Sequence, residues 1–315
     1  MSQRVTFFWL SSTIALTLMV LTACGSARAS VAQNGKLNVV ATTTLVGDTV
    51  RRVAGDSINL TVLLPPGSDG HSYEPTPQDM AAVADASVVF ANGLGYETFL
   101  QALITNADSS TKVVEVSRNI TPLTFTEEGQ HAGEQGDEGH GVDPHVWFNP
   151  LNVASWTGVI ADQLGALDTP NATTYKTNAE KYQAELQQFD NSLKAQFTQI
   201  PPERRKLVTD HDTFGYLASH YHFDLVGAVI PSTSSTAEPS AQEIAALEET
   251  VKKYNVPAVF VANEVNASVA KRLTADTGIK LVSVYVESLS QPGGPADTYV
   301  AFMQYNAAAI TNGLK

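Results

Sequence analysis

Residues 169–202 read TPNATTYKTNAEKYQAELQQFDNSLKAQFTQIPP, and the architecture of the chain depends on this stretch. Apolar and aromatic side chains recur in it at intervals of three or four residues, at Tyr175, Ala179, Tyr182, Leu186, Phe189, Leu193 and Phe197. This spacing places them on one face of a single helix. Thr169 is a suitable N-cap before Pro170, and the Pro201-Pro202 pair stops the helix. We predict one helix of about 29 residues, which at 1.5 Å per residue is roughly 44 Å long.

The segments on both sides of this helix alternate between strand-like and helix-like patterns. Apolar runs of strand length lie before it at 36–44, 58–64, 86–91 and 112–116, and after it at 206–209, 223–229, 258–262 and 280–284. Helical stretches such as 45–53 and 78–84 lie between the runs, and Ser240 with Glu243 forms a capping box for a later helix. Alternation of this kind predicts parallel sheets that are buried on both faces. The predicted fold class is α/β, with two Rossmann-like lobes of parallel sheet flanked by helices and joined by one long rigid helix.

The N-terminus differs in composition from the rest of the chain. Arg4 is the only charge in the first 24 residues, and residues 5–21 are almost entirely apolar. This pattern predicts a secretory signal, although the apolar run also reaches the lower limit of a membrane-spanning length. The ending Leu-Thr-Ala-Cys resembles the lipobox of bacterial lipoproteins, which implies cleavage after residue 23 and lipid attachment at Cys24. Several acyl chains there would anchor an exported protein stably to the membrane.

The predicted organisation follows from these patterns. Residues 1–23 form the signal peptide, 24–35 a tether, 36–168 the N-terminal lobe, 169–200 the linking helix and 201–315 the C-terminal lobe. Within the first lobe, residues 126–142 are acidic and rich in glycine, and they lack large apolar side chains, which predicts a mobile loop. This loop is either a solvated insertion or a segment that collects metal ions through His131 and His140.

Charge and cysteine content exclude several classes of function. The chain has 19 Lys and Arg against 32 Asp and Glu, a net charge of −13, which argues against a nucleic-acid partner. Its one cysteine excludes an internal disulfide and thiolate metal clusters. Any metal site must therefore use histidine, aspartate and glutamate.

Three histidines lie where a strand ends or a turn begins. His71 follows the strand at 58–64, His145 lies in the turn DPHVWFNP, and His211 directly follows the strand that begins at residue 206. Glu287 comes shortly after the strand at 280–284. Open α/β sheets bind ligands at the carboxyl ends of their strands. These four residues are therefore candidates for a site between the lobes, to which each lobe would supply two. Position alone does not decide, because the chain has four further histidines, His131, His140, His220 and His222.

Longer motifs around these histidines carry a family resemblance. They read GHSYEPTPQD at 70–79, DPHVWFNP at 143–150 and TDHDTFGY at 209–216, and shorter matches follow at 238–243, 285–289, 297–299 and 305–306. Together they resemble the zinc/manganese solute-binding lipoproteins of ABC transporters, the cluster A-I or adhesin-lipoprotein family, over residues 36–315. The resemblance implies two lobes joined by a long helix, with one metal ion held by His71, His145, His211 and Glu287. The family usually has aspartate at the last position, so Glu287 could coordinate directly or through a water.

The ligand set favours zinc over manganese. Three imidazoles and one carboxylate suit tetrahedral Zn²⁺, whereas Mn²⁺ prefers more oxygen ligands and a higher coordination number. In the family that the chain resembles, a histidine as third ligand favours zinc, and the third ligand here is His211. Each ligand ring also needs a hydrogen-bond partner, and the nearby candidates are Glu74, Asp143, Asp212 and Glu264.

The implied function is capture of a divalent metal, zinc first, by an exported, lipid-anchored monomer that faces the periplasm or the cell exterior. It would deliver the ion to a membrane ABC permease that a separate ATPase drives, because this chain has no phosphate-binding loop of its own. A manganese-binding member of the family and a surface adhesin are the alternatives. A zinc hydrolase is disfavoured, because the sequence has no His-Glu-x-x-His motif and a fourth protein ligand would close the site. We expect no enzyme activity.

Overall fold

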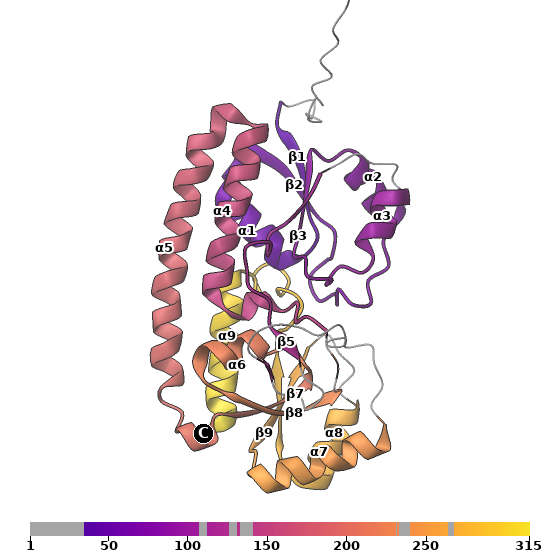
Figure 1. The fold of residues 1–315 in the computed structure, drawn as a ribbon, viewed down its shortest axis with the longest axis vertical. Coiled ribbons are helices and arrows are strands. Elements are labelled where there is room, and N and C mark those ends of the chain that lie inside the picture. Colours follow the sequence, from indigo (N-terminus) through magenta and orange to yellow (C-terminus); the bar gives the residue numbers. More distant parts are fainter. Residues whose placement is uncertain are drawn as a thin grey trace, which may run out of the picture.

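The computed structural model describes residues 35–106, 112–125, 131–132, 141–230, 232, 240–263 and 268–315. Two α/β lobes are stacked one above the other, and one long helix, α5, runs along the side of both, with α4 between it and the upper lobe (Figure 1). The predicted fold class is therefore confirmed. The signal peptide, Cys24 and nearly all of the tether lie outside the described residues, as does His140. Within the described ranges, no helix combines the length and apolarity that crossing a membrane requires.

The N-terminal lobe contains a parallel sheet of four strands in the order β2-β1-β3-β4. The strands are β1 (Leu37–Ala41), β2 (Ile58–Val62), β3 (Val88–Ala91) and β4 (Lys112–Glu115), and the helices are α1 (Thr44–Ala54), a short 3₁₀ turn (Gly55–Ser57), α2 (Pro77–Ala84) and α3 (Leu100–Asn106). Successive side chains of a strand point to opposite faces of the sheet. Val39 and Phe90 accordingly join a core cluster with α1, whereas Val40 and Val89 join a second cluster on the other face. Burial on both faces accounts for the nearly continuous apolar runs in the sequence.

The C-terminal lobe repeats this plan with the strand order β10-β9-β7-β8, again all parallel. Its strands are β7 (Lys206–His211), β8 (Asp224–Ile230), β9 (Ala258–Ala262) and β10 (Lys280–Val284), and its helices are a 3₁₀ turn (Pro202–Arg204), α6 (Gly215–Tyr221), α7 (Ala241–Tyr254), α8 (Ser268–Thr277) and α9 (Tyr299–Leu314). The predicted capping box between Ser240 and Glu243 is present at the start of α7. His211 is the last residue of β7 itself and does not follow the strand.

The predicted linking helix is shorter than expected at its N-terminal end. Residues Thr169–Asn171 form a 3₁₀ turn, and α5 runs from Ala172 to Phe197, which is 26 residues or about 39 Å. The reason is that the preceding helix, α4 (Pro150–Leu167), ends just before Asp168, so these residues have to make the tight reversal between two antiparallel helices. Thr169 is therefore part of the turn and not a helix cap.

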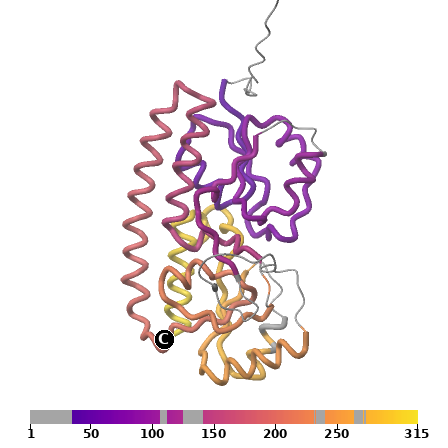
Figure 2. Tube along the Cα trace, viewed as in Figure 1, coloured from indigo at the N-terminus to yellow at the C-terminus, as the bar shows by residue number. Residues whose placement is uncertain are grey.

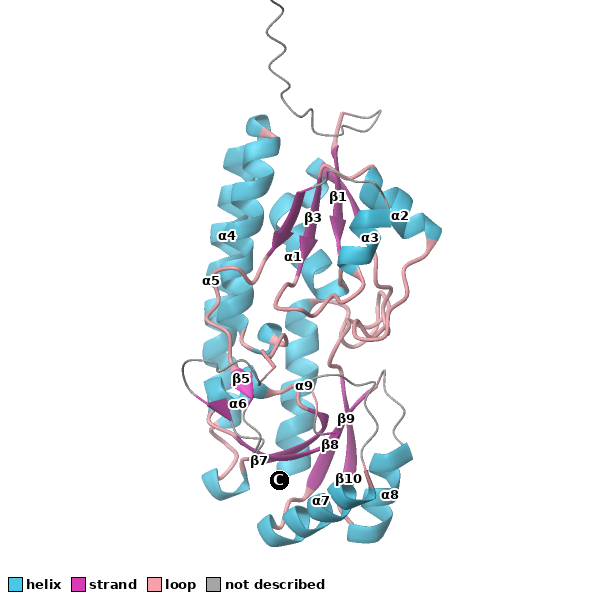
Figure 3. Cartoon of the chain, turned by 45° about the vertical axis from the view of Figure 1, so that its right-hand side comes forward, coloured by secondary structure: helices cyan, strands magenta, loops and turns pink. Residues whose placement is uncertain are grey.

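The helix α5 packs against both lobes. It contacts α4 and α1 of the upper half and α9 of the lower half, and the chain trace in Figure 2 shows it spanning nearly the full height of the molecule. The rotated view in Figure 3 shows α4 beside it and α9 rising toward the upper lobe. One core cluster is continuous from Val39 through Leu186 on α5 to Phe260 on β9. This continuity couples the two lobes through packed side chains.

Two small elements lie near the junction of the lobes. A 3₁₀ turn covers Val146–Phe148, and two-residue strands β5 (Thr124–Phe125) and β6 (His131–Ala132) pair antiparallel. The backbone of His131 thus pairs with Phe125, while most of the acidic segment at 126–142 lies outside the described residues.

Candidate metal centre

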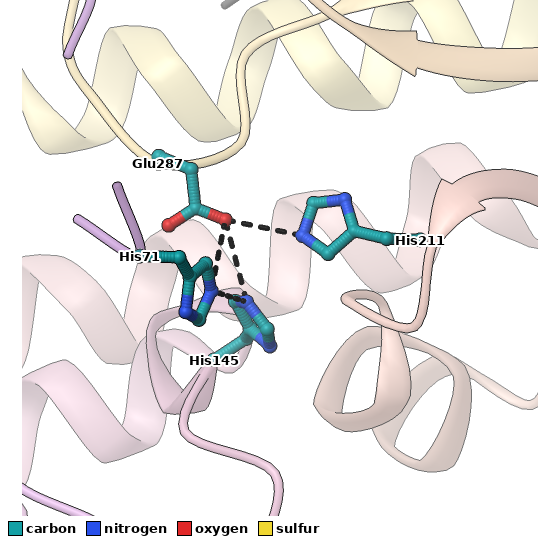
Figure 4. Close-up of side chains that lie close together, drawn as sticks. All are labelled: His71, His145, His211 and Glu287. Atoms are coloured by element: carbon teal, nitrogen blue, oxygen red, sulfur yellow. Dashed lines mark hydrogen bonds and ion pairs between the residues drawn. The ribbon is translucent and has the colours of Figure 1, made fainter. Parts of the chain in front are cut away.

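The four predicted ligand residues meet between the two lobes. One ligand atom from each of His71, His145, His211 and Glu287 lies within 4.8 Å of all the others, and three of these residues are fully buried (Figure 4). The atoms that converge are the three imidazole Nε2 atoms and the Oε1 atom of Glu287. The structure therefore brings together, from positions up to 216 residues apart, the set that the sequence predicts (287 − 71 = 216).

His71 is placed by the turn that follows β2. Its backbone N–H donates to Asp69 Oδ1 at 2.8 Å, which fixes the turn around the ring. The preceding residue has to be glycine, because a Cβ on Gly70 would lie 2.5 Å from the hydroxyl oxygen of Tyr96. The Nε2 atom of His71 lies 3.4 Å from that of His145.

The rings of His145 and His211 are each oriented by an aspartate close by in sequence. Asp143 Oδ1 lies 2.9 Å from both the backbone nitrogen and Nδ1 of His145. Asp210 Oδ1 lies 2.9 Å from the backbone nitrogen and 3.1 Å from Nδ1 of His211. In both rings a proton on Nδ1 faces the carboxylate, which leaves Nε2 free to bind a cation. The predicted partner role of Asp143 agrees with this geometry.

The prediction for Asp212 is wrong, because its neighbour Asp210 holds His211. Asp210 reaches the ring because its other oxygen accepts the backbone N–H of Ala262 at 2.9 Å, which pins the carboxylate across the sheet between β7 and β9. Burial raises the pKa of Asp212 to about 6, with the Asp143 charge contributing in the same direction. Glu74 is exposed, and it is Asp69 that bonds to the His71 turn. Glu264 lies outside the described residues.

Glu287 presents its two carboxylate oxygens to different partners. Oε1 lies 3.2 Å from Nε2 of His211, 3.3 Å from that of His145 and 3.8 Å from that of His71. Oε2 instead accepts a hydrogen bond from the hydroxyl group of Tyr96. Sequence reasoning missed Tyr96, although it lies in the turn after β3, at the same carboxyl edge of the sheet that pointed to the histidines.

The loop that carries Glu287 is bonded to the N-terminal lobe. Trp147 Nε1 donates to the carbonyl oxygen of Val286 at 3.0 Å, the Gly67 amide donates to Ser288 Oγ at 2.9 Å, and the Leu289 amide donates to Thr44 Oγ1 at 2.9 Å. Glu287 follows β10 of the C-terminal lobe, so His71 and His145 come from the N-terminal lobe and His211 and Glu287 from the C-terminal lobe, which is the division that the sequence predicts. The bonds of the Glu287 loop to the N-terminal lobe join the two lobes beside the centre.

The buried histidines and carboxylates of this centre shift one another's pKa values. Burial disfavours the charged form of His211, but Asp210 and Glu287 outweigh this effect and raise its pKa to about 10. Burial likewise opposes charge on His145, yet Asp143 and Glu287 raise its pKa. Burial lowers the pKa of His71. Burial alone would raise the pKa of Glu287, but the surrounding histidines hold it well below its usual range. The metal-free centre thus holds a proton on His211 opposite an ionised carboxylate.

Comparison with known proteins places this geometry in a family. Residues 39–313 match the family described as the periplasmic component A of the zinc-uptake complex. The chain belongs to this family. Its members are solute-binding proteins for metal transport, and this is not an enzyme family.

Curated relatives of the family cover nearly the whole chain. The manganese-binding lipoprotein MntA of Halalkalibacterium halodurans is 33% identical over 314 residues, 99% of each chain. The iron ABC transporter substrate-binding lipoprotein MtsA of Streptococcus pyogenes is 33% identical over 306 residues, 95% of this chain and 96% of that one. This protein is therefore similar to substrate-binding proteins of metal ABC transporters, which work with a permease and an ATPase.

Solved structures of the family share the fold. The periplasmic zinc-binding protein TroA of Treponema pallidum has a TM-score of 0.79 at 26% identity, covering 89% of this chain and 99% of its own. The Mn-bound periplasmic metal-binding protein of Candidatus Liberibacter asiaticus has a TM-score of 0.77 at 26% identity, covering 88% and 99%. Binding of a single divalent metal ion is supported by these neighbours together with the three-histidine, one-glutamate cluster.

Metal binding to this centre should release a proton. Because the pKa of His211 is raised to about 10, the ring is protonated at neutral pH, and only the neutral ring can bind a metal ion. The apparent affinity for Zn²⁺ should therefore fall about tenfold for each unit of acidification between about pH 8 and pH 6. Competition with a chelator of known pH dependence measures this slope. Asp210→Asn should make the slope shallower, since one of the two carboxylates that raise the pKa of His211 is gone, and a wild-type affinity independent of pH would contradict the assignment.

Proposed function

We propose that this protein captures Zn²⁺ outside the cytoplasm and delivers it to a membrane ABC permease. The observation that carries the choice of metal is the donor set, three imidazole nitrogens and one carboxylate oxygen facing a common point. Zinc accepts this set in a tetrahedron with bonds of about 2.0–2.1 Å, whose edges are about 3.3–3.4 Å long. Three separations between ligand atoms, 3.2, 3.3 and 3.4 Å, are close to these edges, and the separation between His71 Nε2 and Glu287 Oε1 is wider at 3.8 Å.

Manganese is the second candidate. Several relatives are described as binding or transporting manganese or iron, and one structural neighbour is Mn-bound. Mn²⁺ prefers more oxygen ligands than this cluster supplies, and that preference is why we rank it below zinc.

The proposed setting of the protein follows from its sequence and its relatives. We propose that Cys24 carries the lipid anchor after removal of residues 1–23, that the mature chain works as a monomer, and that residues 36–168 and 201–315 act as the two metal-binding lobes. The relatives are described as lipoproteins, which supports an exported, membrane-anchored location. His131 and His140 are proposed to collect cations for the site.

Zinc should bind at least about 100-fold more tightly than manganese. The reason is that nitrogen ligands favour Zn²⁺ over Mn²⁺ throughout the divalent series. Purified protein stripped of metal would be titrated with each ion in competition with a chelator, and its metal content after growth in unsupplemented medium would be measured.

Affinity by itself does not establish the physiological cargo, because zinc outranks manganese at most nitrogen sites. The second arm is therefore growth of a deletion strain in chelator-treated medium. With trace zinc added, we expect cells that carry the gene to grow better than the deletion strain. With trace manganese added, we expect no such difference in growth. A growth defect that depends on manganese alone would assign the second candidate.

A further inference from the structure

We propose that Tyr96 determines the metal preference of this centre by holding one oxygen of Glu287, so that the carboxylate offers the metal a single oxygen. The inference rests on the proposed function, because it takes His71, His145, His211 and Glu287 as the ligands. It assigns Tyr96 a positioning role and no direct contact with the ion.

The two oxygens of Glu287 are sharply divided in their contacts. Oε1 faces the Nε2 atoms of the three histidines, as the dashed lines in Figure 4 show, while the second oxygen points away from His145 and His211. That second oxygen accepts a hydrogen bond from the hydroxyl group of Tyr96, and this bond joins residues 191 positions apart. Both side chains are buried, at 0% and 1% exposure, so no bulk water competes for the bond.

The hydroxyl of Tyr96 cannot easily turn away from Glu287. Its ring packs edge-on against His71 at 5.0 Å and against Trp147 at 5.2 Å between centroids. On another side Gly70 approaches so closely that even a methyl group would overlap the ring and the hydroxyl.

The turn that carries Tyr96 is also held in place. The carboxylate of Glu97 accepts the backbone N–H groups of Asn92 at 2.6 Å and Gly93 at 3.1 Å, together with the hydroxyl of Thr42 at 2.6 Å. These bonds tie the turn after β3 to the end of β1. The donor is thus preorganised before any metal arrives.

A fixed donor on one oxygen limits how the carboxylate can bind a metal ion. Four-coordinate Zn²⁺ needs only one oxygen beside three imidazoles. Mn²⁺ and other ions that prefer oxygen gain from a second oxygen, and that oxygen is already engaged here. The side chain of glutamate is long enough to contact Tyr96 and the histidines at the same time. This reach is a physical reason for glutamate at position 287, where the family usually has aspartate.

The test is Tyr96→Phe, which removes the hydroxyl and keeps the ring. Dissociation constants for Zn²⁺ and Mn²⁺ would be measured on the purified protein by chelator competition. We expect the ratio of zinc to manganese affinity to fall about tenfold, because hydrogen bonds to charged acceptors are of this strength. Tyr175→Phe is the matched control, since it removes a hydroxyl whose partner, Asp168, lies at the α4–α5 turn, at the top of the molecule and away from the junction of the lobes (Figure 1). Its ratio should stay at the wild-type value.

Cobalt reports the coordination number directly. Co²⁺ in the wild-type centre should show the intense visible absorption of a four-coordinate ion, and in Tyr96→Phe this absorption should weaken as the freed oxygen joins the metal. In a Glu287→Ala background, Tyr96→Phe should no longer change the affinity ratio, because the effect of Tyr96 passes through Glu287. An unchanged ratio and an unchanged cobalt spectrum in the single variant would overturn the proposal.

A separate measurement keeps the inference testable if Tyr96→Phe fails to fold. X-ray absorption of the zinc-loaded wild-type protein should show three nitrogen ligands and one carboxylate oxygen at bonding distance, and a second Glu287 oxygen on zinc would refute the role of Tyr96. Failure of the proposed function looks different. In that case the wild-type protein itself would bind neither ion, whatever residue stands at position 96.

Discussion

Replacing His211 with alanine is expected to weaken Zn²⁺ binding by about 100-fold to 1000-fold. A structural zinc site of four ligands contributes about 10–16 kcal/mol, so one ligand accounts for about 2.5–4 kcal/mol. The loss should be among the largest at the site, because His211 is the one ligand of the four that stands on the sheet of the C-terminal lobe. Without it, the C-terminal lobe would supply one of the remaining three ligands, Glu287, from the loop after β10.

Two measurements check this expectation. Chelator competition gives the dissociation constant, and the zinc-induced rise in the unfolding midpoint gives an independent reading, since a bound ligand at free concentration L stabilises the folded state by RT ln(1 + L/Kd). In His211→Ala the dissociation constant should rise, and the zinc-induced increase in the unfolding midpoint should become much smaller.

The matched control is His222→Asn, which removes an exposed histidine 11 positions away (222 − 211 = 11). His222 has a φ of 60°, and asparagine tolerates this left-handed conformation better than most residues. Zinc affinity in the control should equal that of the wild type. If both variants lost affinity equally, or His211→Ala bound zinc normally, His211 would not be a ligand.

The sequence was sufficient for the parts of the fold that depend on local periodicity. The strands are apolar runs because both faces of each sheet are buried, and α5 shows its buried side at Tyr175, Ala179, Tyr182, Leu186, Leu193 and Phe197. The ends of parallel strands pointed to the four candidate ligands, because open sheets gather these ends at one edge, and the motifs around them selected them through the family resemblance. Each of these rules acts within a strand, a helix or a single sheet.

What the sequence could not supply is the set of contacts between distant segments. Tyr96 and Glu287 are 191 residues apart, and nothing local to either predicts their hydrogen bond. The choice of Asp210 over Asp212 depends on the Ala262 amide across the sheet. The attachment of the Glu287 loop to the N-terminal lobe depends likewise on Trp147 and Thr44. Such contacts require the tertiary structure.

Asp190 is a further case, because a charged residue occupies the buried face of α5 where periodicity pointed to Phe189. Its side chain is fully buried. Oδ1 lies 2.7 Å from Nε2 of His220 and accepts the hydroxyl of Tyr221 at 2.9 Å, and Oδ2 lies 2.7 Å from Nζ of Lys194. Burial would raise the pKa of Asp190, but the bonds to His220, Lys194 and Tyr221 outweigh it and lower the pKa. Asp190 thus joins the long helix to α6 of the C-terminal lobe.

Asp190→Ala is therefore expected to lower the free energy of unfolding by about 3 kcal/mol. The buried Tyr221 hydroxyl and the largely buried His220 ring would each lose a partner, at about 1–3 kcal/mol per unsatisfied group. Lys194 is 45% exposed and adds little, because its ion pair is screened by water. Urea denaturation of the metal-free protein measures the change. Asp190→Asn should lose less, since the amide oxygen can still accept the Tyr221 hydroxyl.

The dissociation constant for Zn²⁺ should stay within about threefold of the wild-type value in Asp190→Ala, because none of the groups that contact Asp190 is a ligand. Glu185→Ala on the exposed side of α5 is the control, and surface changes of this kind shift stability by about 0.5 kcal/mol or less. If Asp190→Ala were as stable as this control, the buried carboxylate would not fasten α5 to α6. If it instead lost zinc affinity in proportion to its loss of stability, α5 would be energetically coupled to the metal centre. The stability of the α5–α6 contact and the affinity for zinc would then not be independent properties.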